Sequence, residues 1–146
     1  MSDLIRLPAI TLWQPWASLL AHGIKPHETR SWPAPPALVG ERVAIHAAAR
    51  PVRPRDLPAL LERECYGSNL PPYNLPLGCL LGTARLTYSR HMSGVRPLSH
   101  ADRIAGNWEP GRFAWRFEDH RPFVDPIPMR GRQRIWYAEI PREVVS

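Results

Sequence analysis

The segment KPHETR brings three charged side chains of different chemistry close together: Lys25, Glu28 and Arg30. Lys25 is the only lysine among the 19 basic residues of the chain, and all the others are arginines. An ammonium group can lose its proton near neutral pH whereas a guanidinium group cannot, so a single lysine in an arginine-rich chain indicates chemistry that arginine does not supply. The alternative is that Lys25 is an ordinary residue of a solvated loop.

Glu28 and Arg30 lie in a segment, 25–32, that we predict to be a β-strand. Successive side chains of a strand point to opposite faces, so Glu28, Arg30 and Trp32 share one face. One interpretation is a salt bridge on a solvent-exposed face. The other is a binding site in which Glu28 keeps Lys25 protonated and the two cations hold a phosphate. In that site Glu28 could accept a proton from a 2′-hydroxyl group or hydrogen-bond a base edge.

A short predicted helix precedes this strand and must position its beginning. Pro15 suits the first helical position, Gly23 suits the position after the end, and apolar residues recur between them at helical spacing. Gln14 stands at the entrance, where the unpaired backbone N–H groups of the first turn can also bind a phosphate or a carbonyl oxygen. We therefore include Gln14 among the candidate binding residues.

The remaining pattern is one of short strands separated by proline-rich and glycine-rich loops. We predict strands over 9–12, 42–49, 79–88, 112–118 and 135–140, helical segments over 56–64 and 97–104, a loop over 66–78 and a turn over 125–128. Gly82 marks a bulge or a close backbone approach within its strand. The expected fold class is α+β: a small mixed β-barrel of about six strands with two or three short flanking helices, in a single domain over 1–146.

A second cluster of basic residues lies near the carboxy-terminal end. The loop MRGRQR carries Arg130, Arg132 and Arg134, which could clamp a phosphate backbone or form a solvated hairpin. Arg130 and Arg132 therefore join the candidate nucleic-acid-binding residues.

His46, on the strand face opposite Ile45, is better explained as a structural histidine than as a catalytic one.

The composition favours a polyanionic partner. The formal net charge is +6, and arginine carries almost all of the basic excess. Guanidinium groups bind phosphates in a bidentate manner and stack on bases, so RNA or a nucleotide is the expected partner. Of the tryptophans near the charged segment, Trp13, Trp16 and Trp32 could stack on a base. We favour Trp32, because Trp16 shares the apolar stripe of the helix.

Several other functional classes lack their sequence signals. Two isolated cysteines and six scattered histidines show no metal-ligand spacing, and there is no phosphate loop, no GxGxxG and no GxSxG motif. No apolar run approaches the roughly 20 residues that span a bilayer. We therefore expect no metal, no cofactor and no membrane association, in a cytoplasmic protein for which a monomer is the simplest state.

Four blocks of the chain together resemble the ASCH domain, the activating signal cointegrator-1 homology domain. They cover residues 14–32, 43–48, 78–86 and 115–141, in the order of the family. The resemblance implies a β-barrel similar to the PUA domain, with a cleft beside the first helix and the GxKxxExR turn. Members of the family have been linked to RNA or DNA binding, to ribonuclease activity and, in one branch, to deacetylation of acetylated cytidine nucleosides.

The resemblance assigns roles only where single positions match. Lys25 occupies a position similar to the catalytic lysine of the amidohydrolase branch, but Glu28 stands where that branch has a threonine, and the distant glutamate of that branch has no clear counterpart. We therefore expect an RNA-binding or nucleotide-binding module first. A hydrolase acting on RNA phosphodiesters or on acetylated cytidine, with Lys25 and Glu28 as catalytic residues, is the second hypothesis. A protein-interaction module is the third.

Overall fold

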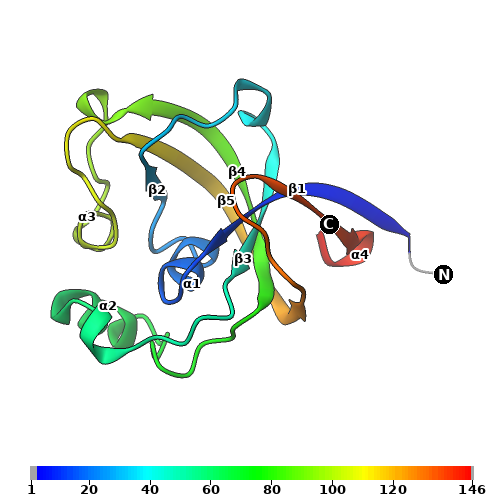
Figure 1. Ribbon diagram of the computed structural model, residues 1–146, viewed down its shortest axis with the longest axis horizontal. Coiled ribbons are helices and arrows are strands. Elements are labelled where there is room, and N and C mark those ends of the chain that lie inside the picture. The colour runs from blue at the N-terminus through cyan, green and yellow to red at the C-terminus, as the bar shows by residue number, and fades with distance from the viewer. Residues whose placement is uncertain (1–2, 146) are drawn as a thin grey trace.

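The computed structural model describes residues 3–145 as one mixed six-stranded sheet with short helices around it (Figure 1). The strands are β1 (Leu4–Leu12), β2 (His27–Arg30), β3 (Arg42–Ala47), β4 (Cys79–His91), β5 (Phe113–Pro128) and β6 (Trp136–Pro141). The α-helices are α1 (Trp16–Ala21), α2 (Ala59–Gly67), α3 (His100–Ile104) and α4 (Arg142–Val145). The predicted α+β class is confirmed, with four α-helices among the described residues where two or three were expected.

The sheet is strongly curved, and its strands run in the order β2-β5-β4-β3-β1-β6. In Figure 1 the long strands β4 and β5 arch over the centre of the molecule, while β1 and β6 extend toward the side where both termini lie. The two ends of this order, β2 and β6, are not paired with each other among the described residues, so the barrel is open. An open, curved sheet of this kind provides a concave side in which a helix can pack.

Strand β1 connects the two halves of the sheet, since it pairs in parallel with β3 and antiparallel with β6. It begins at Leu4, earlier than the 9–12 predicted, because its pairing with β6 runs from Leu4 opposite Pro141 to Ala9 opposite Trp136. Thr11 lies opposite His46 in the parallel register. The carboxyl ends of β1 and β3 therefore meet next to the loop that joins β5 to β6.

The predicted turn over 125–128 is wrong, because β5 continues as a strand to Pro128. Ile127 and Pro128 pair with Leu80 and Cys79 at the beginning of β4. Strand β2 pairs only with the first part of β5, so no strand within residues 3–145 pairs with the other side of the later part. Proline has no backbone N–H and is tolerated at such an edge.

Gly82 is the close approach that the sequence predicted. A Cβ atom at this position would lie 2.5 Å from the carbonyl oxygen of Arg121, on the neighbouring strand. The register between β4 and β5 shifts at three places, the first of them between Leu80 and Gly82. Such bulges bend and twist a strand pair, which explains the strong curvature of this long ladder.

Helix α1 packs into the concave side of the sheet. Leu19 and Leu20 are fully buried, as the apolar stripe predicted, and Gly23 follows the helix in a left-handed conformation with φ of +77°. Strand β2 starts four residues later and is short, 27–30 rather than 25–32. Helix α2 begins at Ala59 rather than at 56, with Pro58 as its N-terminal cap. The turn of α1 into β2 is thus the element that positions the charged segment.

Among residues 3–145, no helix has the length and apolar character required to cross a membrane.

Candidate functional site

The carboxylate of Glu28 is the centre of the charged segment. Its Oε1 atom accepts hydrogen bonds from Lys25 Nζ (2.8 Å) and from the backbone N–H of Thr29 (3.2 Å), and its Oε2 atom lies 3.3 Å from Arg30 Nη2. Burial by itself would raise the pKa of Glu28, but the charges of Lys25 and Arg30 and the two hydrogen bonds outweigh it and hold this pKa below its ordinary value. Glu28 is therefore an ionised hydrogen-bond acceptor.

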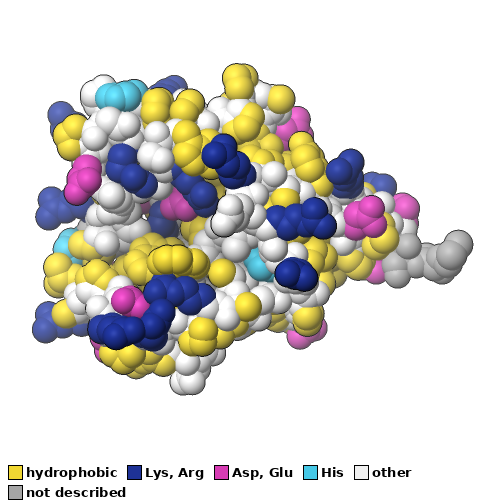
Figure 2. All heavy atoms as spheres, viewed as in Figure 1, with side chains coloured by type: hydrophobic (Ala, Val, Ile, Leu, Met, Phe, Trp, Pro, Cys, Tyr) yellow, Lys and Arg dark blue, Asp and Glu magenta, His cyan; other side chains and the backbone are white. Residues whose placement is uncertain are grey.

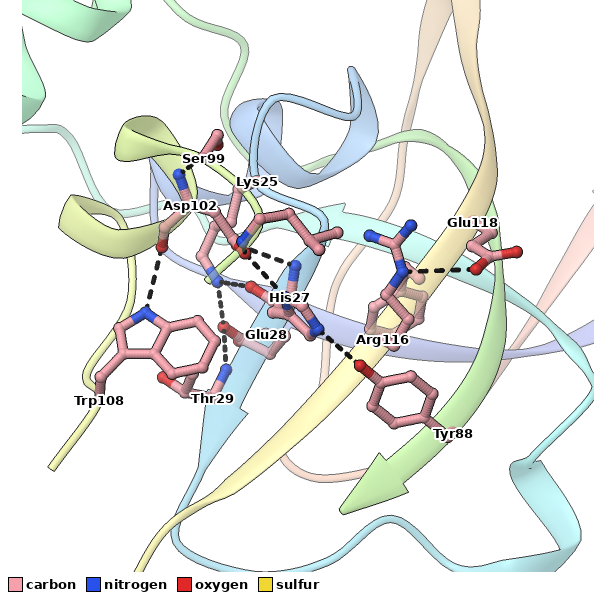
Figure 3. A network of polar contacts seen from close by, with 12 residues as sticks. Lys25, His27, Glu28, Thr29, Tyr88, Ser99, Asp102, Trp108, Arg116 and Glu118 are labelled. Atoms are coloured by element: carbon pink, nitrogen blue, oxygen red, sulfur yellow. Dashed lines mark hydrogen bonds and ion pairs between the residues drawn. The ribbon is translucent and has the colours of Figure 1, made fainter. Parts of the chain in front are cut away.

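Lys25 lies behind this carboxylate rather than in an open cleft. Its side chain is only 1% exposed, and Nζ also donates to the carbonyl oxygen of His27 (Figure 3). Lys25 is absent from the lining of the cavities beside Arg30 and beside the β5–β6 loop. The expectation that its ammonium group forms the wall of an anion pocket therefore differs from the structure, in which Lys25 orients Glu28 from inside the protein.

A second buried polar pair, His27 and Asp102, adjoins the first. His27 Nδ1 donates to Asp102 Oδ2 at 2.7 Å, and the Tyr88 hydroxyl lies 2.9 Å from His27 Nε2 (Figure 3). Burial would raise the pKa of Asp102, but the bonds from His27 and from the backbone N–H of Leu98 lower it below its ordinary value. This network joins β2, β4 and the segment that contains α3. Sequence reasoning missed Asp102, because 75 residues separate it from its histidine.

Two adjoining hollows flank Arg30. We call the first the arginine hollow: a cavity of about 490 Å³ between the ends of β1 and β3 and the β5–β6 loop. It is lined by Thr11, Trp13, Arg30, His46, Ala48, Ala49, Gly78, Met129, Arg130, Gly131, Arg132, Gln133 and Arg134. No carboxylate is among these lining residues.

The second cavity, the glutamate hollow, has a volume of about 610 Å³. It is lined by Thr11, Leu12, Trp13, Trp16, Glu28, Thr29, Arg30, Ala105, Asn107 and Arg112. The two hollows share Thr11, Trp13 and Arg30, so they lie next to each other, and we refer to them together as the depression. Figure 2 shows this face hollowed between the part of the molecule that carries α3 and the part that carries α2, with acidic, basic and hydrophobic side chains around the opening.

Trp13 is the aromatic side chain common to both hollows, and 55% of it is exposed. The Arg50 guanidinium lies 3.8 Å from the centre of its ring and thereby supports it by a cation–π contact. Trp32, which we favoured from the sequence, lines neither hollow and instead packs edge-on against Trp115 at 5.0 Å. Alternation along a strand identified the face of Trp32 but not what covers that face.

The Gln14 side chain is buried, and its amide is fully engaged within the protein. Its Oε1 atom accepts from the backbone N–H of Ser18, while Nε2 donates to Ser18 Oγ (2.8 Å) and to the carbonyl oxygen of Pro76 (2.9 Å). Gln14 thus satisfies the first turn of α1 and attaches the 66–78 loop to it. Gln14 lines neither hollow, so its side chain is not placed to contact a ligand there.

The basic loop predicted from MRGRQR forms one wall of the arginine hollow. Arg130, Arg132 and Arg134 all line it, and none of them pairs with a carboxylate among residues 3–145. Figure 2 shows Lys or Arg side chains at the surface in this central part of the face. These guanidinium groups are free to bind an anion.

His46 fixes the base of this loop. Its Nε2 atom donates to the carbonyl oxygen of Met129 at 2.6 Å, and its Nδ1 atom lies 3.2 Å from the Thr11 hydroxyl group. The space is tight, since a Cβ atom on Gly131 would lie 2.5 Å from the His46 ring. Burial lowers the pKa of His46, which agrees with a neutral, structural imidazole.

Arg112 is a second residue that sequence reasoning missed. Like Arg30 it lines the glutamate hollow, and the Nε atoms of both arginines are buried with no hydrogen-bond partner among the described residues. Arg112 Nη2 donates to the carbonyl oxygen of Thr29 at 3.1 Å, which holds the side chain over β2. The glutamate hollow therefore places the acceptor Glu28 beside the guanidinium groups of two arginines.

Within residues 3–145, no three His, Cys, Asp or Glu side chains are grouped so that they could hold a metal ion. The polar chemistry of the site is that of carboxylate, guanidinium, indole and amide groups.

Comparison with known protein families identifies the class to which a protein with this fold belongs. The family model of the ASCH domain matches residues 10–143, so the chain belongs to the ASCH domain family. The predicted resemblance is confirmed.

Among characterised proteins, the chain is similar to the human (Homo sapiens) protein Activating signal cointegrator 1, at 39% identity over 130 residues. The match covers 87% of this chain but 21% of the human protein, so the chain spans about a fifth of the length of that relative.

Solved structures share the fold at lower identity. The crystal structure of ASCH from Zymomonas mobilis matches with a TM-score of 0.54 and 17% identity, over 93% of this chain and 88% of that one. Two point mutants of the same protein each match with a TM-score of 0.50 and 19% identity, over 93% of this chain and 91% and 89% of theirs. At these identities the comparison establishes the fold and nothing further.

Proposed function

We propose that this ASCH domain binds RNA or a nucleotide in the depression formed by the arginine hollow and the glutamate hollow. The observation that carries the proposal is the lining of the arginine hollow, which combines four arginines and an exposed tryptophan without any carboxylate. A concave surface of one charge sign with an aromatic wall is complementary to a phosphate backbone bearing unstacked bases. The net charge of +6 adds long-range attraction for the same ligand.

The phosphate contacts belong to the basic loop. Arg130, Arg132 and Arg134 have no competing carboxylate among the described residues, so a phosphate does not have to displace an existing partner. Guanidinium groups bind phosphate oxygens through two parallel N–H donors. The loop itself is anchored through His46, which limits the conformational entropy lost on binding.

The base contacts belong to the glutamate hollow. Trp13 presents a face that Arg50 supports from one side, and a base stacked there would lie beside Glu28. Glu28 is ionised and can accept a hydrogen bond from a base N–H group or from a 2′-hydroxyl group. The guanidinium groups of Arg30 and Arg112, which line the same hollow, are suited to base acceptors.

The hydrolase hypothesis ranks second on the same geometry. A carboxylate with a lowered pKa is a weak general base, and Glu28 is of this kind. Lys25 is buried behind Glu28 and does not line either hollow, so it would act on a substrate only through that carboxylate. The hypothesis requires turnover of RNA or of acetylated cytidine by the purified protein that Glu28→Gln abolishes while the fold is retained.

The binding proposal is tested by fluorescence anisotropy with a labelled single-stranded RNA. Arg132→Gln should weaken binding several-fold, since one phosphate contact is lost. The matched control is Arg63→Gln, which removes an exposed arginine from helix α2, outside both hollows. Equal affinities of the two variants, or no binding by the unmodified protein, would contradict the proposal.

A further inference from the structure

A third cavity continues the depression beyond the basic loop. This strand-edge hollow, of about 660 Å³, is lined by Arg6, Met129, Arg130, Arg132, Gln133, Ile135, Trp136, Tyr137, Ala138 and Glu139. It shares Met129, Arg130, Arg132 and Gln133 with the arginine hollow. The basic loop is therefore not the end of the charged surface but a ridge with a hollow on each side, both of which Arg130 and Arg132 line.

The outer end of this hollow repeats the chemistry found at the opposite end of the depression. Tyr137 is 54% exposed on β6, and the guanidinium group of Arg6 on β1 lies 4.6 Å from the centre of its ring. Trp13 and Arg50 form the same type of pair at the other end of the depression. Aromatic rings and guanidinium planes are the two side-chain surfaces on which unstacked bases lie in complexes with single strands.

The sheet topology explains why these two residues face the same hollow. Arg6 and Glu139 are register partners of the antiparallel β1–β6 pair, as are Pro8 and Tyr137. Alternation along β6 buries Trp136, Ala138 and Ile140 and leaves Tyr137 and Glu139 outward. Glu139 is the only carboxylate among the lining residues, and Arg6, Arg130 and Arg132 outnumber it.

We propose that the strand-edge hollow is an outlying subsite for single-stranded RNA, so that one strand runs from Trp13 across the Arg130–Gln133 ridge to Tyr137. This inference rests on the proposed function and specifies its ligand as an oligonucleotide that occupies three hollows, rather than a mononucleotide that occupies one. A duplex does not fit the arrangement, because its bases are paired with and stacked on each other and are not available to stack on the rings of separate hollows.

The test compares labelled RNAs of about two and about eight nucleotides, lengths below and within the usual site size of single-strand-binding modules. The unmodified protein should bind the longer strand at least about tenfold more tightly than the dinucleotide. Tyr137→Ala should remove about tenfold of affinity for the longer strand and leave the dinucleotide affinity unchanged. Tyr137→Phe keeps the ring and should bind as the unmodified protein does, and Arg63→Gln serves as the control for a change of charge elsewhere.

The outcomes separate the two proposals. If the unmodified protein binds neither RNA, the proposed function fails, and this inference fails with it. If it binds both RNAs with equal affinity, or if Tyr137→Ala binds the longer strand as tightly as Tyr137→Phe does, the subsite is overturned while the proposed function stands. Equal affinity for a duplex of the longer strand would also overturn the single-stranded route.

Discussion

The two charged regions on either side of Glu28 differ in what surrounds their charges. Behind it, Lys25, His27 and Asp102 are buried, and each has a partner within 2.8 Å. In front of it, Arg130 and Arg132 are on the surface of the basic loop and pair with no carboxylate among the described residues. Buried charges must be paired to be tolerated, whereas unpaired exposed cations are available to a ligand. This difference supports the proposal that the buried region contributes stability and that the basic loop binds the ligand.

The largest expected effect separates the two regions through Lys25. Lys25→Met leaves the ionised Glu28 buried without its closest cation, and loss of one partner of a buried pair costs about 3–5 kcal/mol. Denaturant unfolding should show this loss in the free energy of unfolding. The double variant Lys25→Met/Glu28→Gln removes both charges and should recover most of it. A single variant as stable as the unmodified protein would show that the pair is not as buried as described.

Asp102 provides the next test, which depends on pH. Asp102→Asn should lower the free energy of unfolding near pH 7 by about 2 kcal/mol, because hydrogen bonds to a buried charge are lost. The pKa of Asp102 is lowered in the folded state, so its contribution is fully present above the unfolded pKa, roughly 4, and is lost as the pH falls through the folded value.

The measurement is a series of denaturant unfolding curves between neutral and acidic pH. The difference between the unmodified protein and Asp102→Asn should shrink as the pH falls below roughly 4. A difference that is constant over this range would mean that Asp102 is not stabilised as an anion.

Substitutions of two tryptophans test the same comparison, with smaller expected effects. Trp13→Ala should weaken RNA binding about tenfold, or about 1.4 kcal/mol, because a stacking surface is removed. It should change the free energy of unfolding by no more than about 0.5 kcal/mol, as expected for an exposed site. Trp32→Ala should show the opposite pattern, since Trp32 packs against Trp115 and lines neither hollow. Binding loss in Trp32→Ala at unchanged stability would restore the interpretation made from the sequence.

The local pattern around α1 could be predicted because capping and turn residues act over short distances. Pro15 and Gly23 bracket the helix, and alternation put Glu28 beside Arg30. The fold class followed from the six strands that the sequence predicted, and the basic loop was visible as three arginines around Gly131.

The sequence could not indicate how deeply a side chain is buried or which residues distant in the chain contact each other. Spacing along the chain does not show that Lys25 lies inside the protein, nor that Asp102 reaches His27. It also does not show that Trp13 rather than Trp32 lines the hollows, because that depends on the β1–β3 register and on the packing of Trp115. Arg112 and Tyr137 gain their significance in the same way, from strands that are distant in the chain.

The most direct test of the central claim, that the basic loop binds the phosphates of RNA, is the salt dependence of affinity for a single-stranded RNA. The logarithm of the association constant, plotted against the logarithm of the salt concentration, should fall with a slope of roughly −0.7 for each phosphate contacted. The double variant Arg130→Gln/Arg132→Gln should have a shallower slope, by about the amount that two phosphate contacts contribute, and an unchanged free energy of unfolding. The same slope in the double variant and in the unmodified protein would contradict the claim.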